Sequence, residues 1–361
     1  MPSGSMRTVL LAATLGLLAC SKTAEPSAAV RVNQERASPA PSPLPASTSS
    51  TLDTGSQRPT IPDLPKATGH GIPGSKIKHV IVIALENHDA PEIYDDPTNA
   101  PYLHSLVEQY AHAENFDDEL PLEIPSEGHY VWMEAGTHKF SDALFDDDSP
   151  PSPSVNTGSN LHLTRQIKNA GTGLSWMTYQ EGLNNESGAC PIQNSGFYVP
   201  KHNPFVFFRD IAGDPPAKDA AYCVAHHKPY SALRADLAGE LASYVFITPD
   251  ECHDMHWQRG CPEENPVRTG DRWLKSELPP LISYALEHDA VIFLTFDEGG
   301  STPKLPFIAI GSMVKPHYRG TERYNHSSQL RSVELILGLP PLPAVAASND
   351  FADLFKAGAY P

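Results

Sequence analysis

The residues best suited to chemistry in this 361-residue chain follow short apolar runs. Three such runs, at 78–85, 244–247 and 290–296, each lead directly into a polar segment. Together the three polar segments hold Glu86, Asn87, Asp254, His256, Asp297 and Glu298. Carboxylates, an amide oxygen and imidazoles are ligands that a divalent cation accepts. A hydroxyl placed on such a cation loses its proton readily and becomes a nucleophile for a phosphoryl group.

Ser126 is the candidate hydroxyl, and three histidines are candidate partners for it. His202, His256 and His326 can contact phosphate oxygens or protonate a leaving group. Taken alone, each signal is ordinary: Ser126 also fits a helix N-cap, and a lone histidine is usually structural. Their joint occurrence at several strand ends favours a single site that binds a divalent cation and a phosphoryl group.

The elements that must position these residues are predicted strands of a parallel sheet. Continuous β-branched and aromatic runs are typical of strands buried on both faces. In an open α/β sheet the ligand lies beyond the carboxyl ends of the strands, so the three ends should converge. Further strands are expected at 175–179 and 307–310, and helices at 102–113, from Ser126, 161–170, 279–287 and 325–336. Residues 233–241 are expected to be a short amphipathic approach to the second strand. Prolines 279 and 280 are expected in the first turn of their helix, where they are tolerated. This alternation predicts an α/β fold with layered helices.

The N-terminus has the pattern of a targeting segment. An apolar stretch at 8–18 is too short for a permanent membrane anchor and ends in Leu17-Leu18-Ala19-Cys20. This resembles a bacterial lipobox, which implies cleavage after residue 19 and lipid attachment to Cys20; an ordinary secretory signal is the alternative. Residues 20–72, rich in Ser, Pro and Ala, are predicted to be a disordered tether. Residues 73–361 are predicted to form one folded domain.

Charge and cysteine content narrow the function further. A net charge of −17 argues against a nucleic-acid partner but leaves small phosphate esters open, because a metal or a few basic groups can meet their charge locally. The acidic stretch 146–148 is expected to be solvated loop, with a calcium loop as the alternative. Outside the cytosol the pairs Cys190–Cys223 and Cys252–Cys261 should form disulfides. The alternative for the second pair is a zinc site with His253 and His256.

An ordered set of motifs resembles the phosphoesterase family that holds non-specific phospholipases C and acid phosphatases, within the alkaline phosphatase-like superfamily. The set spans about residues 76–339 and comprises Glu86-Asn87, 125–130, 176–181, 198–205, Thr248-Pro249-Asp250 with 253–256, 270–274, 295–299 and 324–327. The resemblance implies a three-layer α/β/α sandwich with a mostly parallel central sheet, and a covalent phospho-enzyme.

The resemblance also assigns roles to individual residues. It makes Ser126 the nucleophile and places His202 and His256 on the phosphate. It puts Glu86, Asn87, Asp297 and Glu298 on a metal or phosphate subsite, with Asp254 and His326 as weaker transfers. The chain departs from the family at Gly128-His129, where Pro-Asn is usual, and at His88-Asp89, where many phospholipases have a small hydroxyl residue and an aromatic.

These observations predict an exported, lipid-anchored, acid-phosphatase-like phosphoesterase, periplasmic or cell-surface, that uses a divalent cation of unknown identity. The short chain favours small phosphate esters over phospholipid, and a phospholipase C is the first alternative. A non-catalytic lipoprotein that binds phosphate or glycan is the second. Sulfatase-like hydrolysis is disfavoured because no sulfatase signature surrounds Ser126.

Overall fold

The structure, a computed structural model, describes residues 75–171, 173–183 and 188–361. The predicted signal peptide, Cys20 and the tether lie outside the described residues. Among the described residues, no helix has the length and apolar character needed to cross a membrane.

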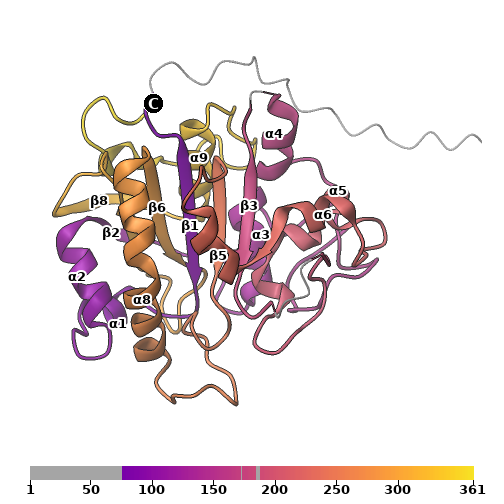
Figure 1. Cartoon of the computed structure of the whole chain (residues 1–361), viewed down its shortest axis with the longest axis horizontal. Helices are drawn as coiled ribbons and strands as arrows, with labels where there is room; N and C mark the ends of the chain where they lie inside the picture. Colours follow the sequence, from indigo (N-terminus) through magenta and orange to yellow (C-terminus); the bar gives the residue numbers. More distant parts are fainter. Residues whose placement is uncertain (1–74, 172, 184–187) are drawn as a thin grey trace, which may run out of the picture. The chain divides into compact units, whose positions relative to one another are not determined.

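An eight-stranded sheet organises the domain, in the order β4-β3-β5-β1-β6-β7-β2-β8. All neighbouring pairs are parallel except the two that involve β7. The strands are β1 (His79–Leu85), β2 (Ala111–Phe116), β3 (Trp176–Gln180), β4 (His227–Pro229), β5 (Tyr244–Thr248), β6 (Ala290–Phe296), β7 (Phe307–Ile310) and β8 (Tyr318–Tyr324). The predicted mostly parallel sheet is therefore confirmed (Figure 1).

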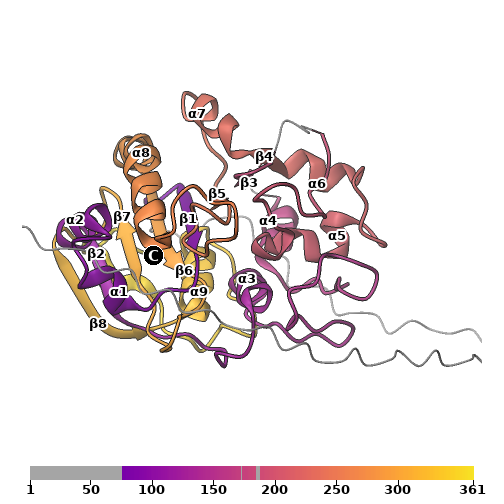
Figure 2. The ribbon, with the colours of Figure 1, turned by 90° about the horizontal axis from the view of Figure 1, so that it is seen from below.

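Helices cover both faces of this sheet. The helices are α1 (Ala90–Tyr94), α2 (Pro101–Gln109), α3 (Ser126–Ala135), α4 (Leu163–Ala170), α5 (Arg209–Ala212), α6 (Ala221–His226), α7 (Leu233–Asp236), α8 (Pro266–Glu287) and α9 (His326–Ile336). Alternate residues of β1 enter two separate cores: Val80 and Val82 pack with apolar residues of α3, α4 and α9, whereas Ile81 and Ile83 pack with those of α2 and α8. Figure 2 shows α8 and α3 on opposite sides of the sheet. The expected three-layer α/β/α arrangement is confirmed.

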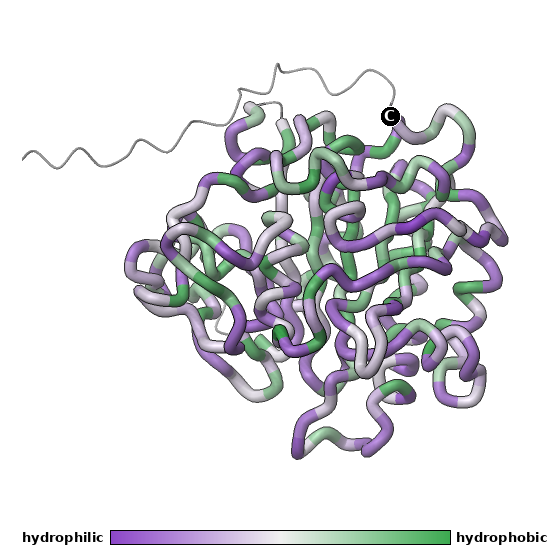
Figure 3. The backbone as a smooth tube through the Cα atoms, turned by 180° about the vertical axis from the view of Figure 1, so that it is seen from behind, coloured by the Kyte–Doolittle hydropathy of each residue, from purple (hydrophilic) through white to green (hydrophobic). Residues whose placement is uncertain are grey.

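The strands that could be predicted from the sequence are the ones that are fully buried. Every residue of β1, β5 and β6 is buried, and Figure 3 shows the hydrophobic stretches gathered in the central strands. These strands bury both faces, so they appear in the sequence as unbroken apolar runs.

Several predicted boundaries were wrong. The helix expected at 102–113 ends at Gln109, and its last residues begin β2, whose half-buried sequence AHAENF lacks an apolar run. Strand β8 was missed because its sequence YRGTERY is mostly polar and lies at the edge of the sheet. Helix α8 begins at Pro266, so Pro279 and Pro280 lie inside the helix and not in its first turn. The short amphipathic segment expected at 233–241 begins with the one-turn helix α7.

Candidate active site

Ser126 opens helix α3 and lies between the ends of β1 and β6. Its Oγ is 3.0 Å from Glu86 Oε2 and 3.1 Å from Glu298 Oε1. The hydroxyl has one proton, so it can donate to only one of these two carboxylates at a time. The other carboxylate then lies near Oγ without accepting a hydrogen bond from it. Ser126 is 2% exposed. The structure thus brings the predicted nucleophile to the predicted strand-end carboxylates.

Two of the predicted metal ligands, Glu86 and Glu298, contact this hydroxyl, and the other two, Asn87 and Asp297, contact each other. Glu86 and Asn87 follow β1, Asp297 and Glu298 follow β6, and the Asn87 N–H donates to Asp297 Oδ1 at 3.2 Å. Three oxygens of this set are buried and accept no hydrogen bond in the described part of the chain: Glu86 Oε1, Asn87 Oδ1 and Asp297 Oδ2. Glu86 Oε1 has a single close polar neighbour, His202 Nε2 at 3.3 Å. Buried polar atoms without a partner are costly, and unpartnered oxygens on carboxylate and amide groups suit a hard divalent cation. The donor set therefore fits a metal.

Electrostatics at this cluster favour a cation as well. Burial raises the pKa of Glu86 well above its ordinary value, and the negative charge of Asp254 raises it further. Burial likewise raises the pKa of Asp297, and the charge of Glu86 adds to that effect. Carboxylates crowded in a buried site resist ionising together unless a positive charge joins them.

His202 is held rigidly beside Glu86. Its Nε2 lies 3.3 Å from Glu86 Oε1, and its Nδ1 lies 3.2 Å from Asp254 Oδ2. The ring stacks on Tyr130 with centroids 5.1 Å apart and planes at 14°. Burial, with the positive charge of Lys201, lowers the pKa of His202 well below its ordinary value. Because both nitrogens face carboxylates, His202 is placed to orient Glu86 and Asp254.

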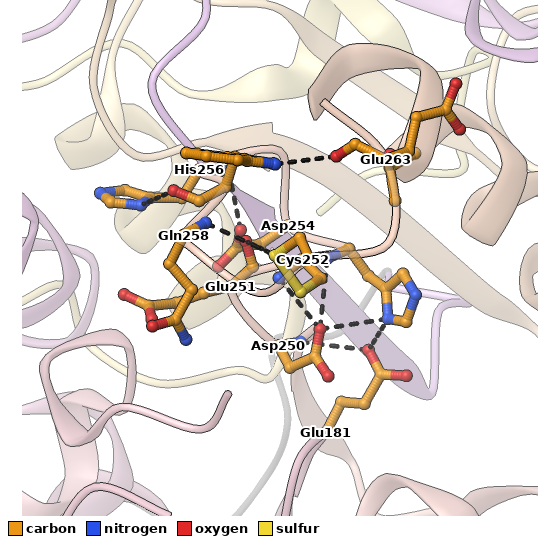
Figure 4. The surroundings of a disulfide bond; sticks show 12 residues. Glu181, Asp250, Glu251, Cys252, Asp254, His256, Gln258 and Glu263 are labelled. Carbon is orange, nitrogen blue, oxygen red and sulfur yellow. Dashed lines mark hydrogen bonds and ion pairs between the residues drawn. A yellow bond between two sulfur atoms is a disulfide. The ribbon is translucent and has the colours of Figure 1, made fainter. Parts of the chain in front are cut away.

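His256 lies at the more exposed side of the cluster, on a loop closed by a disulfide. Its ring centroid is 5.9 Å from that of His202, and its backbone N–H donates to Asp254 Oδ1 at 2.8 Å. The Cys252–Cys261 disulfide spans the loop that carries both residues (Figure 4). The predicted disulfide pairings are present, with Cys190 bonded to Cys223. Since Cys252 and Cys261 are bonded to each other, the alternative zinc site is excluded in this structure.

A separate ion-pair cluster fixes the same loop from its other side. His253 Nδ1 lies 3.0 Å from Glu181 Oε2 and 3.1 Å from Asp250 Oδ1. Glu181 follows β3 and Asp250 follows β5, so the pairs join the loop to two strand ends. Figure 4 shows Glu181 and Asp250 near the disulfide.

His326 contacts the site through a backbone carbonyl. At the start of α9, its Nε2 lies 2.6 Å from the carbonyl oxygen of Asp297. Burial lowers the pKa of His326 to about 4, so the imidazole is neutral at ordinary pH and donates from Nε2. This contact braces the turn that carries Asp297 and Glu298.

His129 is a site residue that was not predicted from the sequence. It lies one turn after Ser126 on α3, on the same helical face, and its Nε2 is 3.1 Å from Asp118 Oδ2. Its ligand atom also falls within 4.8 Å of those of Asp297 and Glu298, whereas Glu86, His202 and Asp254 form a second such group. Ser126 thus lies between two groups that could hold a metal. The departure at Gly128-His129 was the signal that could have indicated it.

The glycine at position 128, where the family usually has proline, has a steric reason. A Cβ there would lie 2.7 Å from Ile124 Cγ2 and 2.8 Å from the Phe145 carbonyl oxygen. Such distances are too short for any side chain, so the loop that contains Phe145 packs directly on the helix backbone.

Lys201 and Asp148 were also missed, and they form an ion pair beside the site. Lys201 Nζ donates to Asp148 Oδ2 at 2.9 Å, and Asp148 Oδ1 accepts from the Glu127 N–H at 3.0 Å. Asp146 and Asp147 are exposed, as expected for a solvated loop, but Asp148 is hydrogen-bonded to the first turn of α3. Lys201 precedes His202 in the 198–205 motif, whereas nothing in the sequence indicated a role for Asp148.

Comparisons with known proteins show what this chain is similar to. The sequence matches the Phosphoesterase family over residues 93–340. It is 27% identical over 310 residues to a phosphate-repressible acid phosphatase of Penicillium chrysogenum, which covers 80% of this chain and 68% of that protein. Similar solved structures include a protein of the alkaline phosphatase superfamily from Vibrio parahaemolyticus (TM-score 0.49, 12% identity, 77% of this chain and 71% of that chain). Another is murine ectonucleotide pyrophosphatase/phosphodiesterase 5 (TM-score 0.48, 11% identity, 77% and 100%).

Proposed function

Because the chain belongs to the phosphoesterase family and is a hydrolase of phosphoric ester bonds, we propose that it cleaves small phosphate esters through a phosphoserine at Ser126. The observation that carries this proposal is the position of the Ser126 hydroxyl between the carboxylates of Glu86 and Glu298. A nucleophile needs a base within hydrogen-bond reach, and here two carboxylates fulfil that condition.

The proposed reaction has two steps. Ser126 Oγ attacks phosphorus and passes its proton to Glu86 or Glu298, while the bond from phosphorus to the ester oxygen breaks. The leaving oxygen takes a proton from a histidine. A water molecule then attacks the phosphoserine and passes a proton to that histidine, while the glutamate returns its proton to Oγ as the bond from phosphorus to Oγ breaks and phosphate is released. His256 is the better donor to the leaving group. It is half-buried whereas His202 is buried, and its Nδ1 lies 3.2 Å from the Trp257 carbonyl oxygen whereas both nitrogens of His202 face carboxylates.

The pH dependence of that donor follows from its surroundings. Burial lowers the pKa of His256 below its ordinary value, and the positive charge of Lys201 adds to this effect. The proton-donating imidazolium is therefore populated mainly in acid, which supports activity of the acid phosphatase type.

A divalent cation is part of the proposal. Glu86, Asn87, Asp297 and Glu298 would hold it, and the three unpartnered oxygens among them support that assignment. When bound, such a cation supplies positive charge that stabilises an attacking alkoxide and phosphoryl oxygens. Metal analysis before and after dialysis against a chelator tests the assignment, and a protein that never holds metal and keeps full activity would contradict it.

Export and lipid anchoring complete the proposal. The Leu17-Leu18-Ala19-Cys20 motif supports them, and the two disulfides suit an oxidising compartment. Fractionation of cells that express the wild type and Cys20→Ser tests the anchor: the wild type should be in the membrane fraction and the variant should be released. Equal distribution of the two would argue against lipid attachment.

Turnover by Ser126→Ala tests the reaction itself. We expect the variant to lose hydrolysis of p-nitrophenyl phosphate while its thermal unfolding is nearly unchanged. Retained turnover would remove Ser126 as nucleophile. Phosphatidylcholine assayed in parallel distinguishes a phospholipase C, and phosphate binding without any turnover would indicate a non-catalytic binding protein.

A further inference from the structure

The proposed site presents an unusual charge problem for an anionic substrate. Five carboxylates lie in this site. Glu86 and Glu298 contact the Ser126 hydroxyl, and Asp297 accepts from the Asn87 N–H. Asp118 and Asp254 pair with His129 and His202. A phosphomonoester brings up to two negative charges into this environment, whereas a phosphodiester brings one. Positive charge contributed by the chain should therefore influence which kind of ester binds.

Lys201 is a cation held beside the site. It belongs to the short 3-10 helix η1 (Pro200–His202) and directly precedes His202, and its side chain is only 14% exposed. Asp148 accepts one of its N–H bonds at 2.9 Å. An ammonium group has three N–H donors, so Lys201 can bind a second anion without leaving Asp148.

Asp148 links Lys201 to the nucleophile helix. One oxygen of its carboxylate accepts from Lys201, and the other accepts from the backbone N–H of Glu127, the residue after Ser126. The loop that delivers Asp148 has the left-handed φ of 56° at this residue. This bridge fixes the ammonium at a short distance from the start of α3.

The positive charge of Lys201 also affects the titratable groups around Ser126. It lowers the pKa of Glu86, against the larger effect of burial, and it lowers the pKa of His202 and His256. These effects agree with the placement given by the contacts.

We propose that Lys201, positioned by Asp148, binds a non-bridging phosphoryl oxygen of the substrate and makes this site prefer phosphomonoesters over phosphodiesters. This inference rests on the proposed function of Ser126. A monoester has three non-bridging oxygens, and a diester has two because its third oxygen carries a second organic group. That group would displace the anionic oxygen from the ammonium and crowd the Lys201–Asp148 pair.

Two substrates measure the preference directly: p-nitrophenyl phosphate as the monoester and bis(p-nitrophenyl) phosphate as the diester. A charge-assisted hydrogen bond contributes enough for Lys201→Gln to lower kcat/KM for the monoester by about 10- to 100-fold. The value for the diester should change by less than about 3-fold, so the ratio of the two should fall. Lys201→Arg should restore most of the ratio, because it keeps the charge.

Lys228→Gln is the matched control. Lys228 forms a comparable ion pair with Asp236, at 2.7 Å, on the sheet edge formed by β4. We expect both activities of this variant to match the wild type. Asp148→Asn tests the positioning role: it should raise KM for the monoester more than it lowers kcat, because Lys201 remains but is less well held.

Inorganic phosphate provides a second measurement that does not depend on turnover. Calorimetric titration of the full-length protein with phosphate should show at least about 10-fold weaker binding in Lys201→Gln than in wild type and Lys228→Gln. Equal loss of monoester and diester activity, or unchanged phosphate affinity, would overturn the role of Lys201 while leaving Ser126 in place. If Ser126→Ala stays active, the proposed function itself fails; phosphate titration then still decides whether Lys201 binds phosphate.

Discussion

The Cys252–Cys261 disulfide allows stability and activity to be separated experimentally. The bond closes the loop that carries Asp254 and His256, and Cys190–Cys223 closes a longer segment that carries His202. The perturbation is a pair of double variants, Cys252→Ser with Cys261→Ser, and Cys190→Ser with Cys223→Ser. Each removes one cross-link and leaves the other as an internal control.

Chain entropy predicts the order of the stability losses. The two bonds span sequence separations of 9 and 33 residues. Loop closure of those lengths corresponds to about 2.6 kcal/mol for the short loop and about 3.7 kcal/mol for the long one. The 190–223 variant should therefore lose more free energy of unfolding.

Geometry predicts the opposite order for activity. In the short loop, Met255 and Trp257 have left-handed φ values of 82° and 67°, conformations that non-glycine residues seldom adopt. Without the cross-link these residues can relax and move Asp254 and His256, and misplacement by about 1 Å can cost about 10²-fold in rate. His202 is held by its stacking on Tyr130 and its carboxylate neighbours, so the 190–223 variant should keep activity within about 3-fold of wild type.

Two measurements suffice for this test. Denaturant unfolding gives the free energies, and kcat/KM for p-nitrophenyl phosphate is measured at a temperature where both variants are folded. If the 252–261 variant keeps full activity, or if both variants lose activity in proportion to stability, the loop does not position the site as described.

Further predictions concern positions away from the reacting atoms. Gly270→Ala, within α8, should lower activity although alanine usually stabilises a helix. The new Cβ would clash with Met255 Cγ and displace the loop closed by the Cys252–Cys261 disulfide. Circular dichroism measures the fold and kcat/KM the activity, and an unchanged kcat/KM would contradict this prediction. Glu334→Gln should stabilise the protein near pH 8 and above. Burial raises the pKa of Glu334 to about 8 from 4.5, so the wild type regains stability as pH falls from about 8 toward 4.5, where the carboxyl is neutral in both states. The shift in pKa limits the difference in free energy of unfolding between the two proteins to about 4 to 5 kcal/mol. Melting temperatures of the two proteins should be similar at pH 5 and should differ at pH 9. The same difference in melting temperature at both pH values would contradict the burial of this charge.

The sequence indicated the strand-end chemistry because chemistry and hydrophobic pattern coincide there. Glu86 and Asp297 directly follow the fully buried strands β1 and β6, which are also hydrogen-bonded neighbours. Their convergence therefore follows from strand identity and parallel pairing alone. The polar edge strand β8 and the half-buried β2 lacked such a signal.

The remaining site residues are positioned by tertiary contacts, which no local sequence pattern predicts. Asp148 meets Glu127 across 21 residues and Lys201 across 53. His129 was visible as a departure from the family pattern, but its role depends on Asp118, which comes from the segment after β2. Loop conformation decides these contacts, and periodicity carries no information about it.

The central claim is that Ser126 becomes phosphorylated during turnover. The most direct test mixes the enzyme with p-nitrophenyl phosphate at acidic pH, quenches it in strong acid within the first turnover, and maps the digested peptides by mass spectrometry. The peptide that contains Ser126 should carry one phosphoryl group, and it should be unmodified in Ser126→Ala and in enzyme without substrate. Full turnover with no phosphoryl group on Ser126, or with that group on another residue, would contradict the mechanism.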